Sequence, residues 1–158
     1  MAHQYRATVS WTKGEGDFTD QRYSRGHTWS FDGGITVPAS SSPLSVKLPY
    51  SVAEAVDPEE ALVAALSSCH MLTFLYVAAK QGFVVEKYTD EAVGEMTRNE
   101  KGKFWVSKVT LAPAIVFAAD KKPTPEQLNH LHHLAHEECY IANSVKSDVV
   151  VRGAMSFA

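Results

Sequence analysis

The segment from Asp57 to Gly82 constrains the fold more than any other part of this sequence. Asp57 can cap a helix that begins at Pro58, acidic residues follow in its first turn, and Gly82 can end it. Apolar residues lie all round this helix, so we expect most of its sides to be buried. A buried helix of such length in a chain of 158 residues suggests that a partner subunit covers part of it.

The rest of the chain predicts several strands and one further helix. Thr124 and Pro125 can open a helix over 125–139, and its apolar stripe ends at Cys139. Two pairs of neighbouring strands are expected, the first joined by a Gly- and Asp-rich loop and the second by Asn99–Gly102. The expected strands are 3–12 with 22–31, 83–98 with 103–117, a short one at 44–50, and 147–158. Together these elements predict an α+β fold in one domain over 1–158.

Composition excludes several classes of function. A net charge of -3 gives no electrostatic reason to expect nucleic acid or an anionic membrane as a partner, since these need a concentrated basic face. The first residues lack the features of a signal peptide, so we expect a cytoplasmic protein. The apolar run Ala61–Ala79 contains Ser67–His70, and we therefore interpret it as a core helix and not as a membrane span.

Cys69 and Cys139 are the two cysteines of the chain. In a reducing cytosol they are not expected to form a permanent structural disulfide, which leaves inert core thiols or redox-active ones. Both fall on core-facing positions of predicted helices, so they can meet only if those helices pack together. If they meet, one can act as a nucleophile and the other can resolve it.

Glu59, in the first turn of the long helix, is too far from Cys69 to assist it in the same chain. Ten residues at about 1.5 Å each separate the two by roughly 15 Å. An antiparallel copy of the helix across a two-fold axis would bring Glu59 of one subunit toward Cys69 of the other. The alternative is that Glu59 only stabilises the helix start through the dipole.

Arg25 shares the apolar face of strand 22–31 with Tyr23 and His27, and a buried guanidinium requires a carboxylate or a ligand. Paired with Glu59 near Cys69, it would favour the reactive thiolate. Two alternatives stay open. Arg25 can extend to water from the strand end, and Arg22, on the opposite face, is a second candidate for the same role.

The histidines between His130 and His136 suggest a possible metal site. His132, His136 and Cys139 recur at helical spacing on one face, which is compatible with zinc. No second ligand group completes a four-coordinate site, so we expect no metal and no cofactor. His70 adjoins Cys69 but points about 100° away from it, and we interpret it as a packing residue.

Two stretches of the sequence resemble motifs of the OsmC/Ohr family of osmotically inducible and organic hydroperoxide resistance proteins. DPEEALVAALSSCHM is similar to its cysteine-bearing helix, and LAHEECYIANSVKSDV to its second cysteine motif. The resemblance implies antiparallel sheets packed round long central helices in an intertwined homodimer with shared active sites. It also implies that Cys69 is the peroxidatic thiol, Cys139 the resolving thiol, and that Glu59 holds the catalytic arginine, for which Arg25 is the best match.

The function that this resemblance implies is thiol-dependent reduction of alkyl or fatty-acid hydroperoxides. A dithiol, in many members a lipoyl group on a carrier protein, would regenerate the thiols. The alternative is a stress-response protein of the same fold that binds a metal or another ligand without peroxidase turnover.

Overall fold

The computed structural model describes residues 2–158 and divides the chain into two compact units, Met1–Ala61 and Leu62–Ala158. Helix α1 begins at the end of the first unit and runs through the second. A single domain over 1–158 stays a prediction.

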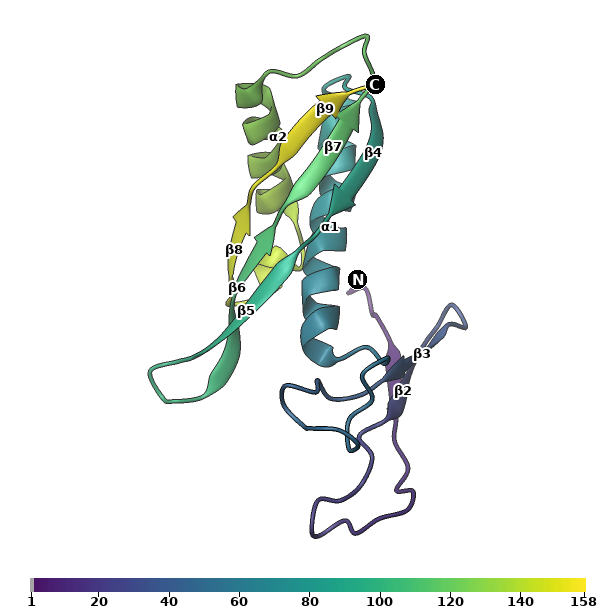
Figure 1. Ribbon diagram of the computed structural model, residues 1–158. Helices are drawn as coiled ribbons and strands as arrows, with labels where there is room; N and C mark the ends of the chain where they lie inside the picture. Colours follow the sequence, from purple (N-terminus) through teal and green to yellow (C-terminus); the bar gives the residue numbers. More distant parts are fainter. Residues whose placement is uncertain (1) are drawn as a thin grey trace. The chain divides into compact units, whose positions relative to one another are not determined.

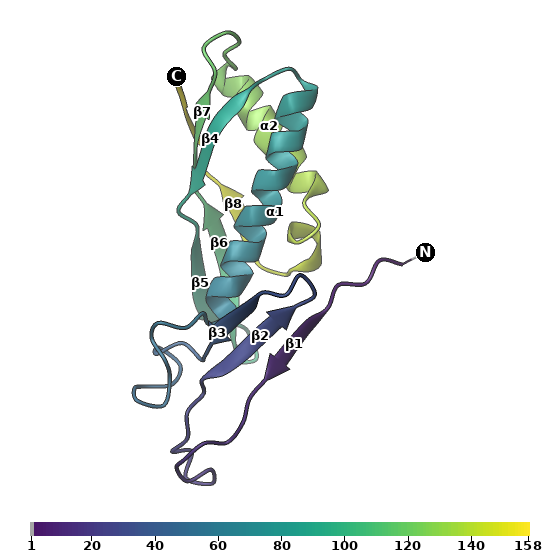
Figure 2. The ribbon, with the colours of Figure 1, turned by 90° about the vertical axis from the view of Figure 1, so that its right-hand side faces the viewer.

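The first unit holds a three-stranded antiparallel sheet in the order β1-β2-β3 (Figures 1 and 2). Its strands are Ala7–Ser10, His27–Phe31 and Thr36–Ala39, with Val9 opposite Trp29 and Trp29 opposite Val37. The predicted pairing of the first two strands is confirmed, although both are shorter than expected. The predicted strand over 44–50 is wrong, because turns occupy this segment and no neighbouring strand pairs with it.

Helix α1 spans Pro58–Lys80 and begins and ends where the sequence predicts. The Asp57 carboxylate accepts a hydrogen bond from the backbone N–H of Glu60 at 2.8 Å, and the Glu60 carboxylate accepts one from the N–H of Asp57. These reciprocal bonds form a capping box. At the other end Gly82 takes a positive φ of 74°, which a residue without Cβ adopts freely, and this stops the helix.

The second unit contains six strands in two three-stranded sheets, ordered β4-β7-β9 and β5-β6-β8. Both sheets mix antiparallel and parallel pairs, since β8 and β9 run parallel to β6 and β7. The predicted hairpin is confirmed, but each long strand is interrupted at its middle, where Asp90 accepts a hydrogen bond from the N–H of Ala112 at 2.7 Å. The strands are β4 Val85–Asp90, β5 Val93–Arg98, β6 Phe104–Leu111, β7 Pro113–Phe117, β8 Asp148–Val151 and β9 Ala154–Phe157.

Helix α2, Pro125–Glu138, lies beside α1, and both helices cover the same side of these strands (Figure 2). Thr124 caps α2 in a capping box with Gln127, as its sequence predicts. The stripe Leu128, Leu131, Ala135 and Cys139 is buried, which confirms the predicted core-facing side. A short 3-10 helix, Ala142–Ser144, follows α2. The α+β class is confirmed.

The surface of α1 differs from the sequence-based expectation. Within the single chain its buried residues are only Leu66, His70, Phe74, Val77 and Ala78. Leu72 and Tyr76 are 61% and 60% exposed, so an apolar face of the helix has no cover from the described residues. By length and composition alone α1 is long and apolar enough to cross a membrane, a property that it shares with core helices, so these two features do not by themselves distinguish the predicted core helix from a membrane span. Only 28% of that stretch is buried within the single chain. That a partner subunit covers the rest stays a prediction.

Candidate active site

The two cysteines meet in the second unit. Cys69 lies in the middle of α1 and is partly exposed, whereas Cys139 caps the end of α2 and is 1% exposed. Burial raises the pKa of Cys139 to about 11, and the neighbouring Cys69 side chain adds to this effect. The structure therefore has an accessible thiol near a buried thiol that stays protonated at neutral pH.

Backbone and side-chain hydrogen bonds hold Cys139 at the end of α2. Its N–H bonds the carbonyl of His136 at 3.3 Å, and its sulfur accepts a hydrogen bond from the N–H of Ala142 at 3.4 Å. The side-chain amide of Asn143 donates to the carbonyls of Glu137 and Cys139, at 2.8 and 3.0 Å. The cysteine thus lies on an ordered turn with a defined sulfur position.

Two pairs of polar side chains lie along α1 between two apolar clusters of the second unit. One cluster is centred on Leu66, Val109 and Leu111, and the other on Phe74, Phe117 and Leu131. Between them along α1 lie Ser67, which donates a hydrogen bond to Asp90, and His70, which bonds His132. Polar groups buried at this depth are costly unless they are paired, so these two pairs are a specific feature of the site.

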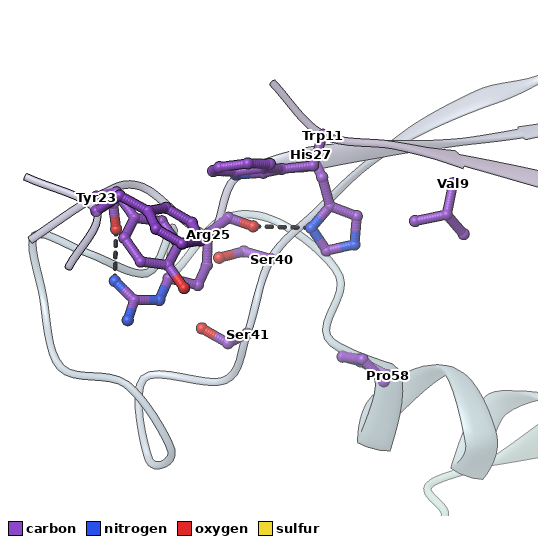
Figure 3. A pocket seen from close by; sticks show the side chains of 9 residues that line it. Val9, Trp11, Tyr23, Arg25, His27, Ser40, Ser41 and Pro58 are labelled. Carbon is purple, nitrogen blue, oxygen red and sulfur yellow. Dashed lines mark hydrogen bonds between the residues drawn. The ribbon is translucent and has the colours of Figure 1, made fainter. Parts of the chain in front are cut away.

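The first unit contains a pocket of about 480 Å³ (Figure 3). Three aromatic rings pack against one another on its wall, with Phe18 and Tyr23 stacked at 4.7 Å and Trp11 edge-on to Tyr23 at 5.5 Å. The lining residues are Val9, Trp11, Phe18, Tyr23, Arg25, His27, Ser40, Ser41 and Pro58. The pocket combines apolar walls with one cation, Arg25.

The guanidinium of Arg25 is held by the chain around it. Its Nη1 donates hydrogen bonds to the carbonyls of Gln21 and Tyr23, at 2.7 and 2.6 Å, and its Cζ lies 3.9 Å from the centre of the Tyr23 ring. No carboxylate of the described residues forms an ion pair with Arg25, so the predicted pair with Glu59 is not formed within this chain. Arg22, the second candidate, is exposed and pairs with Asp20 at 2.7 Å.

His27 belongs to this pocket and was not among the candidates chosen from the sequence. Its Nε2 accepts a hydrogen bond from the Trp29 indole N–H at 2.9 Å, which leaves Nδ1 to donate to the carbonyl of Arg25 at 2.7 Å. The indole has only a donor, so it fixes the neutral Nδ1–H tautomer of His27. The alternation that placed Tyr23, Arg25 and His27 on one face was the available signal.

The histidines of α2 do not gather into a metal site. His132 turns toward His70, and His133 pairs with Glu137 at the surface. Across residues 2–158, no three His, Cys, Asp or Glu side chains lie close enough together to hold a metal ion. The helical spacing of His132, His136 and Cys139 alone is therefore no basis for a zinc site in this chain.

Comparisons with known proteins identify the family to which this fold belongs. A family model described as OsmC-like protein matches residues 51–152. The chain belongs to the OsmC-like family. No curated protein matches its sequence. A solved structure of an OsmC-like protein of unknown function from Vibrio cholerae is 55% identical, covers 97% of this chain and 100% of its own, and superposes with a TM-score of 0.94.

Organic hydroperoxide resistance proteins share the fold of this OsmC-like protein at low identity. The one from Elizabethkingia anophelis is 19% identical, with a TM-score of 0.68 over 100% of both chains. The one from Bacillus subtilis is 18% identical, with a TM-score of 0.58 over 96% of this chain and 98% of its own. Identities this low show a common fold and no more.

Proposed function

We propose that this OsmC-like protein is a two-cysteine thiol peroxidase that reduces organic hydroperoxides. The observation that carries this proposal is the pair of thiols, Cys69 partly exposed on α1 and Cys139 buried at the end of α2, close enough for Cys69 to raise the pKa of Cys139. Their unequal burial supports different roles for the two thiols in this proposal. The accessible thiol reacts with the peroxide, and the buried thiol then reacts with the oxidised form of the first.

The proposed reaction has two steps. The Cys69 thiolate attacks the outer oxygen of the hydroperoxide, the O–O bond breaks, and the alkoxide takes up a proton and leaves as an alcohol. The Cys69 sulfenic acid then condenses with the Cys139 thiol, so that an S–S bond forms, the S–O bond breaks and water leaves. A dithiol reduces the disulfide, and a lipoyl group is our candidate. No bound cofactor is required.

The pocket of the first unit supports an organic substrate. Its aromatic walls suit an alkyl or acyl chain, because each buried methylene contributes about 0.8 kcal/mol of transfer free energy. Arg25 provides a cation that can stabilise the departing alkoxide. Hydrogen peroxide has no apolar group that could pack against these walls.

We propose further that the working form is a homodimer in which Glu59 and Arg25 of one subunit serve Cys69 of the other. Glu59 lies roughly 15 Å from Cys69 along α1, so it cannot reach its own cysteine. The uncovered face of α1, with Leu72 and Tyr76, is the kind of apolar surface that a second copy of the helix would bury. We place this dimer in the cytoplasm, where dithiol reductants are available.

A steady-state assay tests the proposal. Purified protein with dihydrolipoamide should consume cumene hydroperoxide with a kcat/KM at least about tenfold above that for hydrogen peroxide, the preference that a few buried carbons can produce. Absence of consumption of either peroxide would instead favour the non-catalytic, ligand-binding alternative. Equal rates with both would contradict the assignment of the pocket to the organic group.

A further inference from the structure

A pair of buried histidines joins the two helices that carry the cysteines. The His70 Nε2 and His132 Nδ1 atoms are 3.0 Å apart, and the two rings lie nearly parallel, at 14°, with centres separated by 5.3 Å. The side chains are 1% and 6% exposed. Among the hydrogen bonds of residues 2–158, this is the one that links α1 to α2.

The surroundings of the pair hold each ring in place. Phe74 packs on the His132 ring with centres 4.6 Å apart, and His132 Nε2 lies against Gly153, where a Cβ would collide with it. The two outer nitrogens, His70 Nδ1 and His132 Nε2, are buried without hydrogen-bond partners. The inner hydrogen bond is therefore the one polar interaction available to these two rings, and losing it would leave more buried polar atoms unpaired.

The position of this bond relates it to both thiols. His70 directly follows Cys69 on α1, and Cys139 follows His132 by seven residues, two turns further along the same face of α2. Apolar contacts between the helices are not directional and permit small shifts along the helix axes. A buried polar bond has one good geometry, and it can therefore set the register between two packed helices.

We propose that the His70–His132 hydrogen bond is a positioning contact that holds Cys139 in place to react with oxidised Cys69. This inference rests on the proposed two-cysteine function. The histidines act through the helices and touch neither the peroxide nor the sulfur atoms that react. Their effect falls on the second step, in which the Cys139 thiol displaces water from the Cys69 sulfenic acid.

Amide side chains allow a sharp test, because each amide can replace one particular ring nitrogen. Asparagine places its amide atoms near the position of Nδ1, and glutamine near that of Nε2. The pair uses Nδ1 of His132 and Nε2 of His70. His132→Asn and His70→Gln should therefore keep the interhelical bond, whereas His132→Gln and His70→Asn should lose it.

These four variants separate positioning from space filling. Glutamine is closer in size to histidine, so a role in packing alone would make glutamine the better replacement at both sites. A positioning role predicts that asparagine is the better replacement for His132 and glutamine the better replacement for His70. Cooperative urea unfolding of each variant confirms that it is folded, and because the expected preference reverses between two sites, a general loss of stability cannot imitate it.

The readout is the effective concentration of Cys139 toward Cys69, measured by equilibrating the protein in a glutathione redox buffer and quantifying the disulfide. His132→Asn and His70→Gln should stay within about threefold of wild type. The other two should lose about tenfold or more, equivalent to about 30 mV in this two-electron couple. After one equivalent of cumene hydroperoxide, those same two variants should also keep Cys69 sulfenic acid longer, as trapped with dimedone.

The outcomes distinguish the two proposals. Wild-type protein that forms the disulfide in redox buffer but consumes no hydroperoxide would end the peroxidase proposal, while the redox comparison of the variants still tests the positioning. Equal effective concentrations in all four variants, or glutamine preferred at both sites, would overturn the positioning role. The absence of a Cys69–Cys139 disulfide in wild type under oxidising buffer would overturn it as well.

Discussion

Arg25 lies over the ring of Tyr23, with its Cζ 3.9 Å from the ring centre, and donates to the Tyr23 carbonyl at 2.6 Å. The cation is thus fixed by the loop that precedes β2 and faces the pocket without a carboxylate partner among the described residues. Glu59 belongs to the same unit and does not pair with it. A cation held in this way remains available to an anion or to a carboxylate from a second subunit.

Replacing Arg25 should therefore slow the first chemical step. We expect Arg25→Ala to lower the rate of Cys69 oxidation by at least about tenfold, because in the proposed shared site the loss of this cation removes stabilisation of the leaving alkoxide. Arg22→Ala is the matched control, since Arg22 is exposed and pairs with Asp20. Stopped-flow oxidation with cumene hydroperoxide measures both. A reversed ranking would transfer the role to Arg22.

Mixing two inactive variants tests the shared site. Glu59→Ala and Cys69→Ser should each be nearly inactive as homodimers. After co-refolding, random pairing makes about half of the dimers mixed, and each mixed dimer has one intact site, so about a quarter of wild-type activity should return. If native mass spectrometry shows heterodimers and no activity returns, Glu59 acts within its own chain or only stabilises the start of α1.

The histidine pair should make stability depend on pH. The pKa values of His70 and His132 are lowered from 6.5 to about 4, mainly by burial; His136 contributes to the lowering at His70, where Asp90 opposes it, and His70 contributes at His132. Between pH 6.5 and 4 the unfolded chain binds more protons than the folded one, so the free energy of unfolding falls as the pH falls. The loss should be up to about 1 kcal/mol per pH unit for each histidine.

Urea unfolding at pH 7, 5.5 and 4.5 measures this dependence. His132→Asn should flatten the curve, because it removes one of the two groups that must lose a proton on folding. His133→Asn is the control, since His133 is exposed and pairs with Glu137 at the surface. Parallel curves for wild type and His132→Asn would show that burial of this ring is not linked to its protonation.

Gly153 should not tolerate a side chain. A Cβ at this position would collide with His132 Nε2, so Gly153→Ala should destabilise the protein by about 1–3 kcal/mol, as overpacking commonly does. Gly33→Ala, with nothing within 4 Å of its Cβ, should change stability by less than about 0.5 kcal/mol. In a His132→Ala background the cost at Gly153 should largely disappear. An unchanged cost there would locate the strain elsewhere.

Local features of this fold could be predicted from the sequence because their causes are local. The caps of both helices, the glycine that ends α1 and the core-facing stripe of α2 depend on residues a few positions apart. The strand over 44–50 was wrong because alternation does not say whether a neighbouring strand exists, and here Leu44 is 99% exposed. The interruption of the long hairpin depends on Asp90 reaching Ala112, a contact between distant residues.

In the candidate site, too, features with a local signal were predicted and a contact between distant residues was missed. The sequence identified both cysteines and Arg25 as residues of interest, and the apolar positions on α1 and α2 suggested that the thiols would meet. The pairing of His70 with His132 spans 62 positions and has no periodic signal, so His70 was interpreted as a packing residue and His132 as a possible metal ligand. A partner for a buried polar group cannot be identified from its own helix alone.

The central claim, that Cys69 and Cys139 form a peroxidatic pair, is tested most directly by intact-mass and peptide analysis after one equivalent of cumene hydroperoxide. Wild-type protein should lose about 2 Da and yield a peptide pair linked through Cys69 and Cys139. Cys139→Ser should instead gain about 16 Da on Cys69, and Cys69→Ser should remain unmodified. Unchanged wild-type thiols with intact hydroperoxide, or equal consumption by both serine variants, would contradict the claim.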